Sequence, residues 1–196
     1  EGYVDTVLAL KKEYDKDIEI HLGLETEYFP RFWDQLIDFL SDYPFEYFVL
    51  GQHSLGNEIE KILYSGHGTT DGNYLKQYVD QCLAGIDTGK YLYLAHPDLF
   101  LFNGDEAVFD REYRRLCREV RNIPLEINFL GLMEERWYPN EKFWKIAGEE
   151  GNTAVFGCDA HTSKAVWNPE TEQKALQLAA KYGLKVQETV PMPKTF

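Results

Sequence analysis

Short apolar runs alternate along the chain with stretches in which apolar residues recur at helical spacing. The apolar runs predict strands at about residues 18–24, 47–50, 91–95, 124–128 and 153–158, followed by an extended tail at 184–189. Helical spacing, with start signals such as Pro30, predicts helices at about residues 2–14, 30–40, 74–86, 106–120, 141–150 and 170–182. Because strands separated by helices pair in parallel through right-handed crossovers, this order predicts an α/β fold.

The first predicted strand, residues 18–24, distinguishes between two kinds of parallel sheet. Side chains two residues apart share one face of a strand, so Glu19, His21 and Glu25 would lie on one face and the neighbouring Ile and Leu residues on the other. A doubly wound sheet buries both of its faces and would not tolerate Glu19 and His21 together there. The pattern therefore favours a barrel with a polar interior over a doubly wound sheet.

The composition of the chain limits the binding partners and the cellular compartment that can be expected for it. The chain has 196 residues, enough for one large domain at about 150 residues per domain. Its formal net charge of −13 argues against nucleic acid or an anionic membrane as a partner, and no run approaches the ~18 apolar residues of a membrane span. Three widely spaced cysteines, Cys82, Cys117 and Cys158, make a disulfide framework improbable and fit a reducing cytoplasm.

Candidate metal ligands follow four of the predicted strands. Asp159 and His161 come directly after the last long apolar run, and Glu25, His53 and His96 each follow an earlier one. The carboxyl ends of parallel strands meet at one edge of a sheet or barrel, where the βα loops converge. Carboxylate oxygens and neutral imidazole nitrogens suit zinc, manganese or iron. The sequence therefore predicts a divalent-metal site at this edge.

Five phrases in this βα context resemble the PHP (polymerase and histidinol phosphatase) superfamily. They are GLETEY at 23–28, GQHS at 51–54, AHPDLF at 95–100, LEIN at 125–128 and GCDAH at 157–161, and the chain shares YPN at 138–140 with the histidinol-phosphatase branch. The resemblance implies a distorted (β/α)7 TIM-like barrel with up to three divalent metals (Zn, Mn or Fe) that hydrolyses phosphate esters. It also implies that Glu25 bridges two metals, that His53 and His96 bind one metal, and that Asp159 and His161 are catalytic ligands of different metals.

The chain departs from the family pattern at its start. The family begins with a His-x-His strand and further ligands, and nothing before Glu25 contains them. The first predicted strand matches the third strand of the family. We therefore expect the first one or two βα units to be missing, so that residues 1–196 form the C-terminal portion of a single PHP-like phosphoesterase domain.

Other residues are candidates for binding substrate or supporting the ligands. A guanidinium holds a phosphate through two hydrogen bonds, and the resemblance places Arg136 in the loop that binds the substrate phosphate. Asn128 points the same way as Glu126 by period two, and either residue is expected to contact substrate or to hold this loop. Asp98 is expected either to orient a ligand imidazole or to cap its loop, and His21 to support the site from a neighbouring position.

The most favoured activity is hydrolysis of L-histidinol phosphate to L-histidinol and phosphate in histidine biosynthesis, in which metal-bound water supplies the hydroxide. The alternatives are a PHP phosphoesterase with another small phosphorylated substrate and a non-catalytic metal-binding remnant. Arg111, Arg114, Arg115 and Arg118 recur at helical spacing, which predicts a solvated helix face and no phosphate site.

Overall fold

The computed structural model describes residues 2–57 and 63–192 of the chain. Helix α1 (Gly2–Glu13) precedes β1 (Gly23–Thr26), α2 (Trp33–Leu40) and β2 (Tyr47–Leu50). A small hairpin of β3 (Ser54–Leu55) and β4 (Leu63–Tyr64) leads through the turn η1 (Ser65–His67) to α3 (Gly72–Asp87) and β5 (Tyr91–Leu94). The remaining elements are α4 (Glu106–Glu119), β6 (Leu125–Asn128), α5 (Phe129–Met133), α6 (Glu141–Glu150), β7 (Thr153–Gly157), η2 (Ser163–Ala165), α7 (Pro169–Lys181) and β8 (Lys185–Val186).

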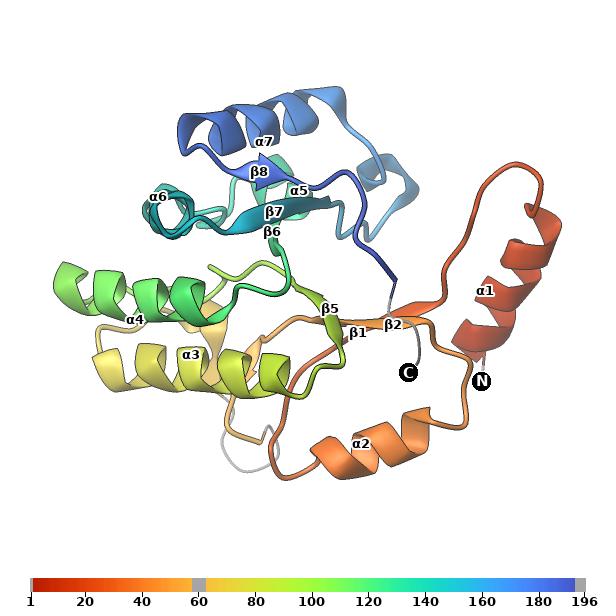
Figure 1. The fold of residues 1–196 in the computed structure, drawn as a ribbon, viewed down its shortest axis with the longest axis horizontal. Coiled ribbons are helices and arrows are strands. Elements are labelled where there is room, and N and C mark those ends of the chain that lie inside the picture. The colour runs from red at the N-terminus through yellow and green to blue at the C-terminus, as the bar shows by residue number, and fades with distance from the viewer. Residues whose placement is uncertain (1, 58–62, 193–196) are drawn as a thin grey trace.

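Six parallel strands form the main sheet in the order β1-β2-β5-β6-β7-β8, which is also their order along the chain. Helices α2, α3, α4, α6 and α7 follow one another in an arc outside the strands, and α1 lies apart from this arc (Figure 1). A doubly wound sheet would reverse its strand order part-way and carry helices on both faces. The structure therefore confirms the barrel type of α/β fold, although the described strands do not close into a complete barrel.

The core lies between the strands and the arc of helices. Its largest fully buried side chains include Leu50 and Leu94 from the sheet, Tyr78 from α3, Tyr113 from α4 and Trp144 from α6. Each of the helices α3, α4, α6 and α7 begins at an Asp or Asn whose side chain accepts a hydrogen bond from a backbone N–H of the first turn. These N-caps fix where each helix begins, and therefore the length of each strand-to-helix loop at the edge that carries the candidate ligands.

The first strand is shorter than the sequence predicted. Residues 18–22 are not in the sheet, and Ile18 is 61% exposed, so the predicted start of this strand is wrong. The carboxylate of Glu46 accepts the backbone N–H of Leu22 at 2.9 Å, and Leu22 returns a carbonyl to the backbone N–H of Glu46 at 2.7 Å. A side chain thus replaces the ladder hydrogen bond that a longer strand would make.

The arginine-rich face of α4 was predicted to be solvated, and the structure shows that part of it forms ion pairs with α6. Arg114 binds Asp110 on its own helix at 2.7 Å, and Glu149 and Glu150 of α6 at 2.9 and 2.8 Å. Arg118 also binds Glu150, at 3.0 Å. These pairs join α4 to α6. Within the described residues, no helix is long and apolar enough to cross a membrane.

Candidate metal centre

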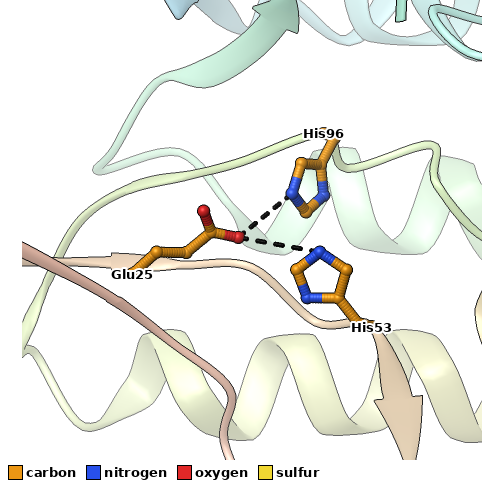
Figure 2. A group of neighbouring side chains, drawn as sticks. All are labelled: Glu25, His53 and His96. Atoms are coloured by element: carbon orange, nitrogen blue, oxygen red, sulfur yellow. Dashed lines mark hydrogen bonds and ion pairs between the residues drawn. The ribbon is translucent and has the colours of Figure 1, made fainter. Parts of the chain in front are cut away.

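Three candidate ligands meet at the carboxyl edge of the sheet: Glu25 lies near the end of β1, and His53 and His96 lie in the segments after β2 and β5. The Oε1 atom of Glu25 lies 3.2 Å from Nε2 of His96 and 3.8 Å from Nε2 of His53, and the two imidazole rings meet edge to face at 4.8 Å (Figure 2). One ligating atom from each residue lies within 4.8 Å of the others. The described part of the chain holds no other such group of three.

The orientation of His53 identifies the nitrogen that faces this centre as an acceptor. Nδ1 of His53 lies 3.0 Å from the carbonyl oxygen of Gly51. A carbonyl oxygen only accepts, so Nδ1 must donate, and in the neutral ring Nε2 then carries a lone pair. That lone pair faces the Glu25 carboxylate, which is also an acceptor. A cation between the two atoms would satisfy both of them, so this arrangement fits a metal ligand.

His96 is held differently. It is buried, its Nε2 faces Glu25, and its Nδ1 has no hydrogen-bond partner among the described residues. Two imidazoles and one carboxylate are a donor set typical of zinc. The residues present therefore fit a divalent metal.

Charge and burial shift the pKa values of the three groups in different directions. For Glu25, burial favours the neutral acid, but the hydrogen bond and positive charge of His96 outweigh it and lower the pKa of the carboxyl. Burial, reinforced by repulsion from His96, lowers the pKa of His53. Burial also opposes the charged form of His96, but Glu25, Glu126 and Asp159 outweigh it and raise its pKa. A low pKa keeps the His53 imidazole neutral, as a metal ligand must be.

Glycine and a second glutamate place Glu25 and His53. The Glu25 carboxylate occupies the space above Gly51, where a Cβ atom would lie only 1.8 Å from its Oε1. Glu27, two residues further along the chain, accepts the backbone N–H groups of His53 and Ser54 through Oε2, at 3.2 and 2.8 Å. The loop that carries His53 is therefore held by a carboxylate from the segment that follows β1.

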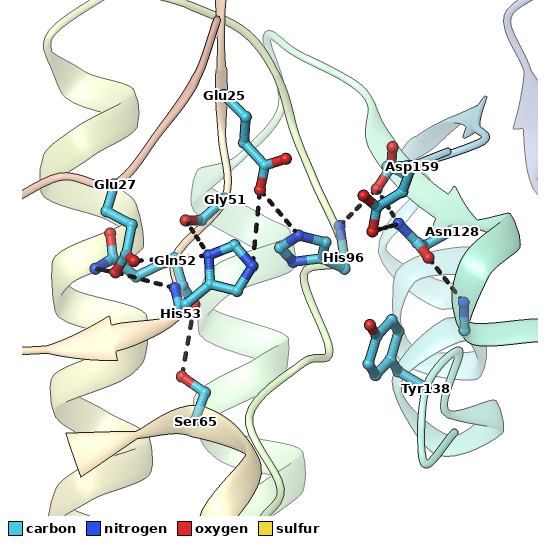
Figure 3. A network of polar contacts seen from close by, with 12 residues as sticks. Glu25, Glu27, Gly51, Gln52, His53, Ser65, His96, Asn128, Tyr138 and Asp159 are labelled. Atoms are coloured by element: carbon cyan, nitrogen blue, oxygen red, sulfur yellow. Dashed lines mark hydrogen bonds and ion pairs between the residues drawn. The ribbon is translucent and has the colours of Figure 1, made fainter. Parts of the chain in front are cut away.

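Asp159 and His161 stand across the site from His53. Oδ2 of Asp159 accepts a hydrogen bond from Nδ2 of Asn128 at 3.2 Å (Figure 3). Oδ1 of Asp159 lies 3.1 Å from Nε2 of His161. His161 is an exposed side chain, and neither residue belongs to the close group of three. They line the same pocket as Glu25 and His53, so four of the five candidate ligands face one pocket, and His96 contacts it through Glu25.

This pocket has a volume of about 460 Å³ and also contains Arg136. The guanidinium of Arg136 binds Glu134 at 2.6 Å and donates to the hydroxyl of Tyr138 at 2.7 Å. The Tyr138 ring in turn lies 6.0 Å from the ring of His96. A cation thus lines the same pocket as the acidic ligands, where a phosphate group could contact it. A larger groove of about 610 Å³ between α4 and α6 includes none of the candidate site residues.

Three supporting predictions need correction or refinement. His21 was expected beside the site, but it binds Glu46 at 2.8 Å, before β1 and β2 begin and thus at the opposite edge of the sheet. It lies there because residues 18–22 are not in the strand. The amide of Asn128 is buried and bonded to Glu126, Asp159 and the backbone N–H of Gly131, which argues against its contacting substrate.

Asp98 holds the backbone at the start of α6, and among the described residues no hydrogen bond joins it to an imidazole. Its Oδ2 accepts the backbone N–H of Asn140, and its Oδ1 has no partner among the described residues. Burial raises the pKa of the Asp98 carboxyl to about 7, and the hydrogen bond from Asn140 only partly opposes this. This contact lies outside the loop that follows Asp98, so it confirms neither of the two expectations for this residue.

The sequence interpretation gave no role to Glu27 or Tyr138, and it gave Glu126 the same two alternatives as Asn128. Period two from Glu25 would have placed Glu27 on the same face of the chain, and Glu126 stands in the LEIN phrase beside Asn128. The sequence thus indicated the position of Glu27 and of Glu126. It did not indicate their partners, which are the backbone N–H groups of His53 and Ser54 for Glu27 and of His96 for Glu126. Tyr138 carried no separate signal beyond the YPN phrase.

Comparison with solved structures identifies the fold. The histidinol phosphate phosphatase of Lactococcus lactis, solved with zinc, L-histidinol and phosphate, matches with a TM-score of 0.70 at 20% identity, over 98% of this chain and 79% of that chain. A proposed histidinol phosphatase from Listeria monocytogenes matches with a TM-score of 0.65 at 22% identity, over 87% of this chain and 74% of that chain. The chain has the histidinol-phosphatase fold.

This fold is the one that the five PHP phrases predicted. No protein-family model and no curated protein sequence matches the chain. The fold likeness therefore rests on the arrangement of the strands and helices.

Proposed function

We propose that the chain is a metal-dependent phosphomonoesterase of the PHP type, with L-histidinol phosphate as the favoured substrate. The observation that carries this proposal is the pair of facing acceptors, Nε2 of His53 and Oε1 of Glu25, in a pocket that also contains Arg136. The likeness in fold to a phosphatase solved with zinc, L-histidinol and phosphate supports it. In this proposal residues 1–196 belong to one domain that acts in the cytoplasm on a small phosphorylated metabolite.

The proposal divides the pocket into two parts. Glu25, His53 and His96 would hold divalent metal, with Asp159 and His161 as further ligands from the opposite loop. Bound zinc or manganese lowers the pKa of coordinated water and neutralises charge on phosphate oxygens. Arg136 would bind the phosphate group of the substrate through two hydrogen bonds, for which its guanidinium is suited. Glu134 pairs with this guanidinium in the absence of phosphate.

Metal content and phosphate release together test the proposal. The purified protein is stripped with a chelator, reloaded with zinc or manganese, and assayed with L-histidinol phosphate and a panel of other phosphomonoesters. We expect metal-dependent phosphate release, fastest from L-histidinol phosphate. The variant His53→Ala should lose metal, whereas His67→Ala, an exposed histidine outside the close group, should retain it.

Each of the other possible outcomes of this experiment would assign a different function to the protein. Turnover of another ester in preference to L-histidinol phosphate would keep the phosphoesterase and replace its substrate. Metal binding without release of phosphate from any ester would indicate a non-catalytic metal-binding domain. Absence of metal binding would contradict the proposal altogether.

A further inference from the structure

Glu126 is a buried carboxylate on β6 that joins two loops of the candidate site. Only 3% of the residue is exposed. Its Oε2 atom accepts the backbone N–H of His96 at 3.0 Å and Nδ2 of Asn128 at 3.1 Å. One oxygen atom thus holds the backbone of a candidate metal ligand and the side chain of a neighbouring residue.

Asn128 extends this connection to the loop after β7. Its Nδ2 also donates to Oδ2 of Asp159 at 3.2 Å, so both amide hydrogens have acceptors (Figure 3). Its Oδ1 accepts the backbone N–H of Gly131, which fixes the direction of the amide. His96 and Asp159, from different loops, are therefore linked through Glu126 and Asn128.

Both ends of this link have unusual backbone conformations. His96 has φ +28° and Asp159 has φ +47°, in the left-handed region that residues other than glycine rarely adopt. Each such residue costs on the order of 1–3 kcal/mol and persists only where surrounding contacts hold it. The hydrogen bond that Glu126 accepts from the His96 backbone N–H and the hydrogen bond that Asn128 donates to the Asp159 side chain are contacts of this kind.

The geometry around Glu126 repeats the geometry around Glu25. Glu25 pairs in register with Val49 and extends over Gly51, two residues further along β2. Glu126 pairs with Val155 and extends over Gly157 in the same way, where a Cβ atom would lie 1.7 Å from its Oε1. The absence of a side chain at Gly157 leaves room for the carboxylate to reach the two loops.

We propose that Glu126 is a positioning residue that fixes His96 directly, and Asp159 through Asn128, in the orientation that the metal centre requires. The inference rests on the proposed function, because it assigns these two ligands to one centre. Glu126 acts through hydrogen bonds, since its Oε2 is already shared by two donors. Within the described residues it does not belong to the close group of metal-ligating atoms.

Two substitutions separate positioning from charge. Glu126→Asp keeps the negative charge but withdraws it by one methylene from both donors. Glu126→Gln keeps the length and one acceptor oxygen but removes the charge. The matched controls are Glu112→Asp and Glu112→Gln on α4, a buried glutamate that pairs with Arg111 and Arg115 and has no contact with the site.

The first measurement is zinc affinity by chelator competition, with urea unfolding to confirm that each variant is folded. We expect Glu126→Asp to weaken zinc binding about 10- to 100-fold, the usual effect of losing a residue that orients ligands, and Glu126→Gln to retain more affinity than Glu126→Asp. The Glu112 variants should bind as the wild type does. Unchanged affinity in Glu126→Asp, or a larger loss in Glu126→Gln, would overturn the proposal.

Amide hydrogen exchange without metal gives an independent measurement. Exchange at His96 and around Asp159 should accelerate in Glu126→Asp and not in Glu112→Asp. Asn128→Ser keeps an N-cap for α5 but removes the bridge, so acceleration should be confined to the segment around Asp159. If Glu126→Asp does not fold, Asn128→Ser still tests the link between Glu126 and Asp159.

The exchange measurement separates the two proposals. If the wild type binds no zinc, the proposed function fails, and exchange alone decides whether Glu126 positions the two loops. Equal exchange at His96 and Asp159 in the Glu126 and Glu112 variants would overturn the inference even if the wild type binds zinc.

Discussion

At the scale of single residues, Glu25 depends on the missing side chain of Gly51. A methyl group there would lie 1.8 Å from Oε1 of Glu25, so Gly51→Ala must displace the carboxylate. The displaced group is the end of a flexible side chain, and we expect the free energy of unfolding to stay within about 1 kcal/mol of wild type. Zinc affinity, measured by chelator competition, should fall by more than about tenfold.

A double-mutant cycle with Glu25→Ala checks the cause. If Gly51→Ala acts only by moving Glu25, it should have no further effect on zinc affinity once that carboxylate is gone. Additive losses would show that Gly51 acts through another contact.

Arg136 and Glu134 allow a second prediction at the residue scale. Arg136→Ala should cost about 2–4 kcal/mol of transition-state stabilisation, measured as a fall in kcat/KM for a phosphomonoester. The metal content of this variant should be unchanged. Glu134→Ala frees the guanidinium from its carboxylate partner, and should bind phosphate at least as tightly as wild type. Steady-state kinetics and phosphate inhibition measure both effects. Equal losses in the two variants would indicate that the loop, and not the cation, is what matters.

The candidate ligands could be located from the sequence because each follows an apolar run, and strand ends in a parallel sheet share an edge. Their supporting contacts could not. The contacts of Glu27 with the His53 loop and of Glu126 with the His96 loop depend on the register between neighbouring strands, which a single sequence does not specify. The position of His21 was predicted wrongly for a different reason: it depended on the start of β1, and this strand begins later than predicted.

At the scale of elements, Glu46 ties α1 to the segment before β1 and to β2. Its carboxylate binds Lys11 at 2.6 Å, His21 at 2.8 Å and the backbone N–H of Leu22 at 2.9 Å. Burial favours the neutral acid, but these three partners outweigh it and lower the pKa of Glu46 to about 2. A carboxyl whose pKa is lowered by folding stabilises the protein above its unfolded pKa and loses this contribution as the pH falls towards 2.

The variant Glu46→Gln tests this contribution. It should lower the free energy of unfolding by about 1 kcal/mol at pH 7, a value reduced for the partial exposure of these groups. Urea unfolding between pH 7 and pH 3 should show the difference from wild type shrinking below about pH 5. A difference that is independent of pH would mean that Glu46 acts by packing alone.

Elements with strong periodicity were predicted closely, and irregular ones were missed. The range predicted for α6 and the strand β2 agree with the structure, because their apolar residues alone define them. The hairpin β3–β4 and the helix α5 were not predicted, since two-residue strands and a five-residue helix carry no periodic signal. Asn128 shows how α5 forms. It is the last residue of β6, and its side chain caps the helix that begins at the next residue.

At the scale of the whole molecule, charge predicts that phosphate binding depends on metal. The chain carries a formal net charge of −13, and the pocket contains Glu25, Glu27 and Asp159. Among the described residues that line it, Arg136 is the one lysine or arginine. A metal-free pocket should therefore repel inorganic phosphate, and the pocket becomes attractive only when divalent cations occupy the ligands.

Isothermal titration of inorganic phosphate into chelated and zinc-loaded protein measures this dependence. We expect the zinc-loaded protein to bind at least about tenfold more tightly, which corresponds to about 1.4 kcal/mol. Raising the salt from 0.1 M to 1 M shortens the screening length from about 10 Å to about 3 Å, so it should weaken binding to the loaded protein and reduce the repulsion in the chelated one. The affinities of the two forms should therefore converge at high salt. Equal affinities at low salt would mean that Arg136 binds phosphate without help from bound metal, and would place the phosphate site outside the metal centre.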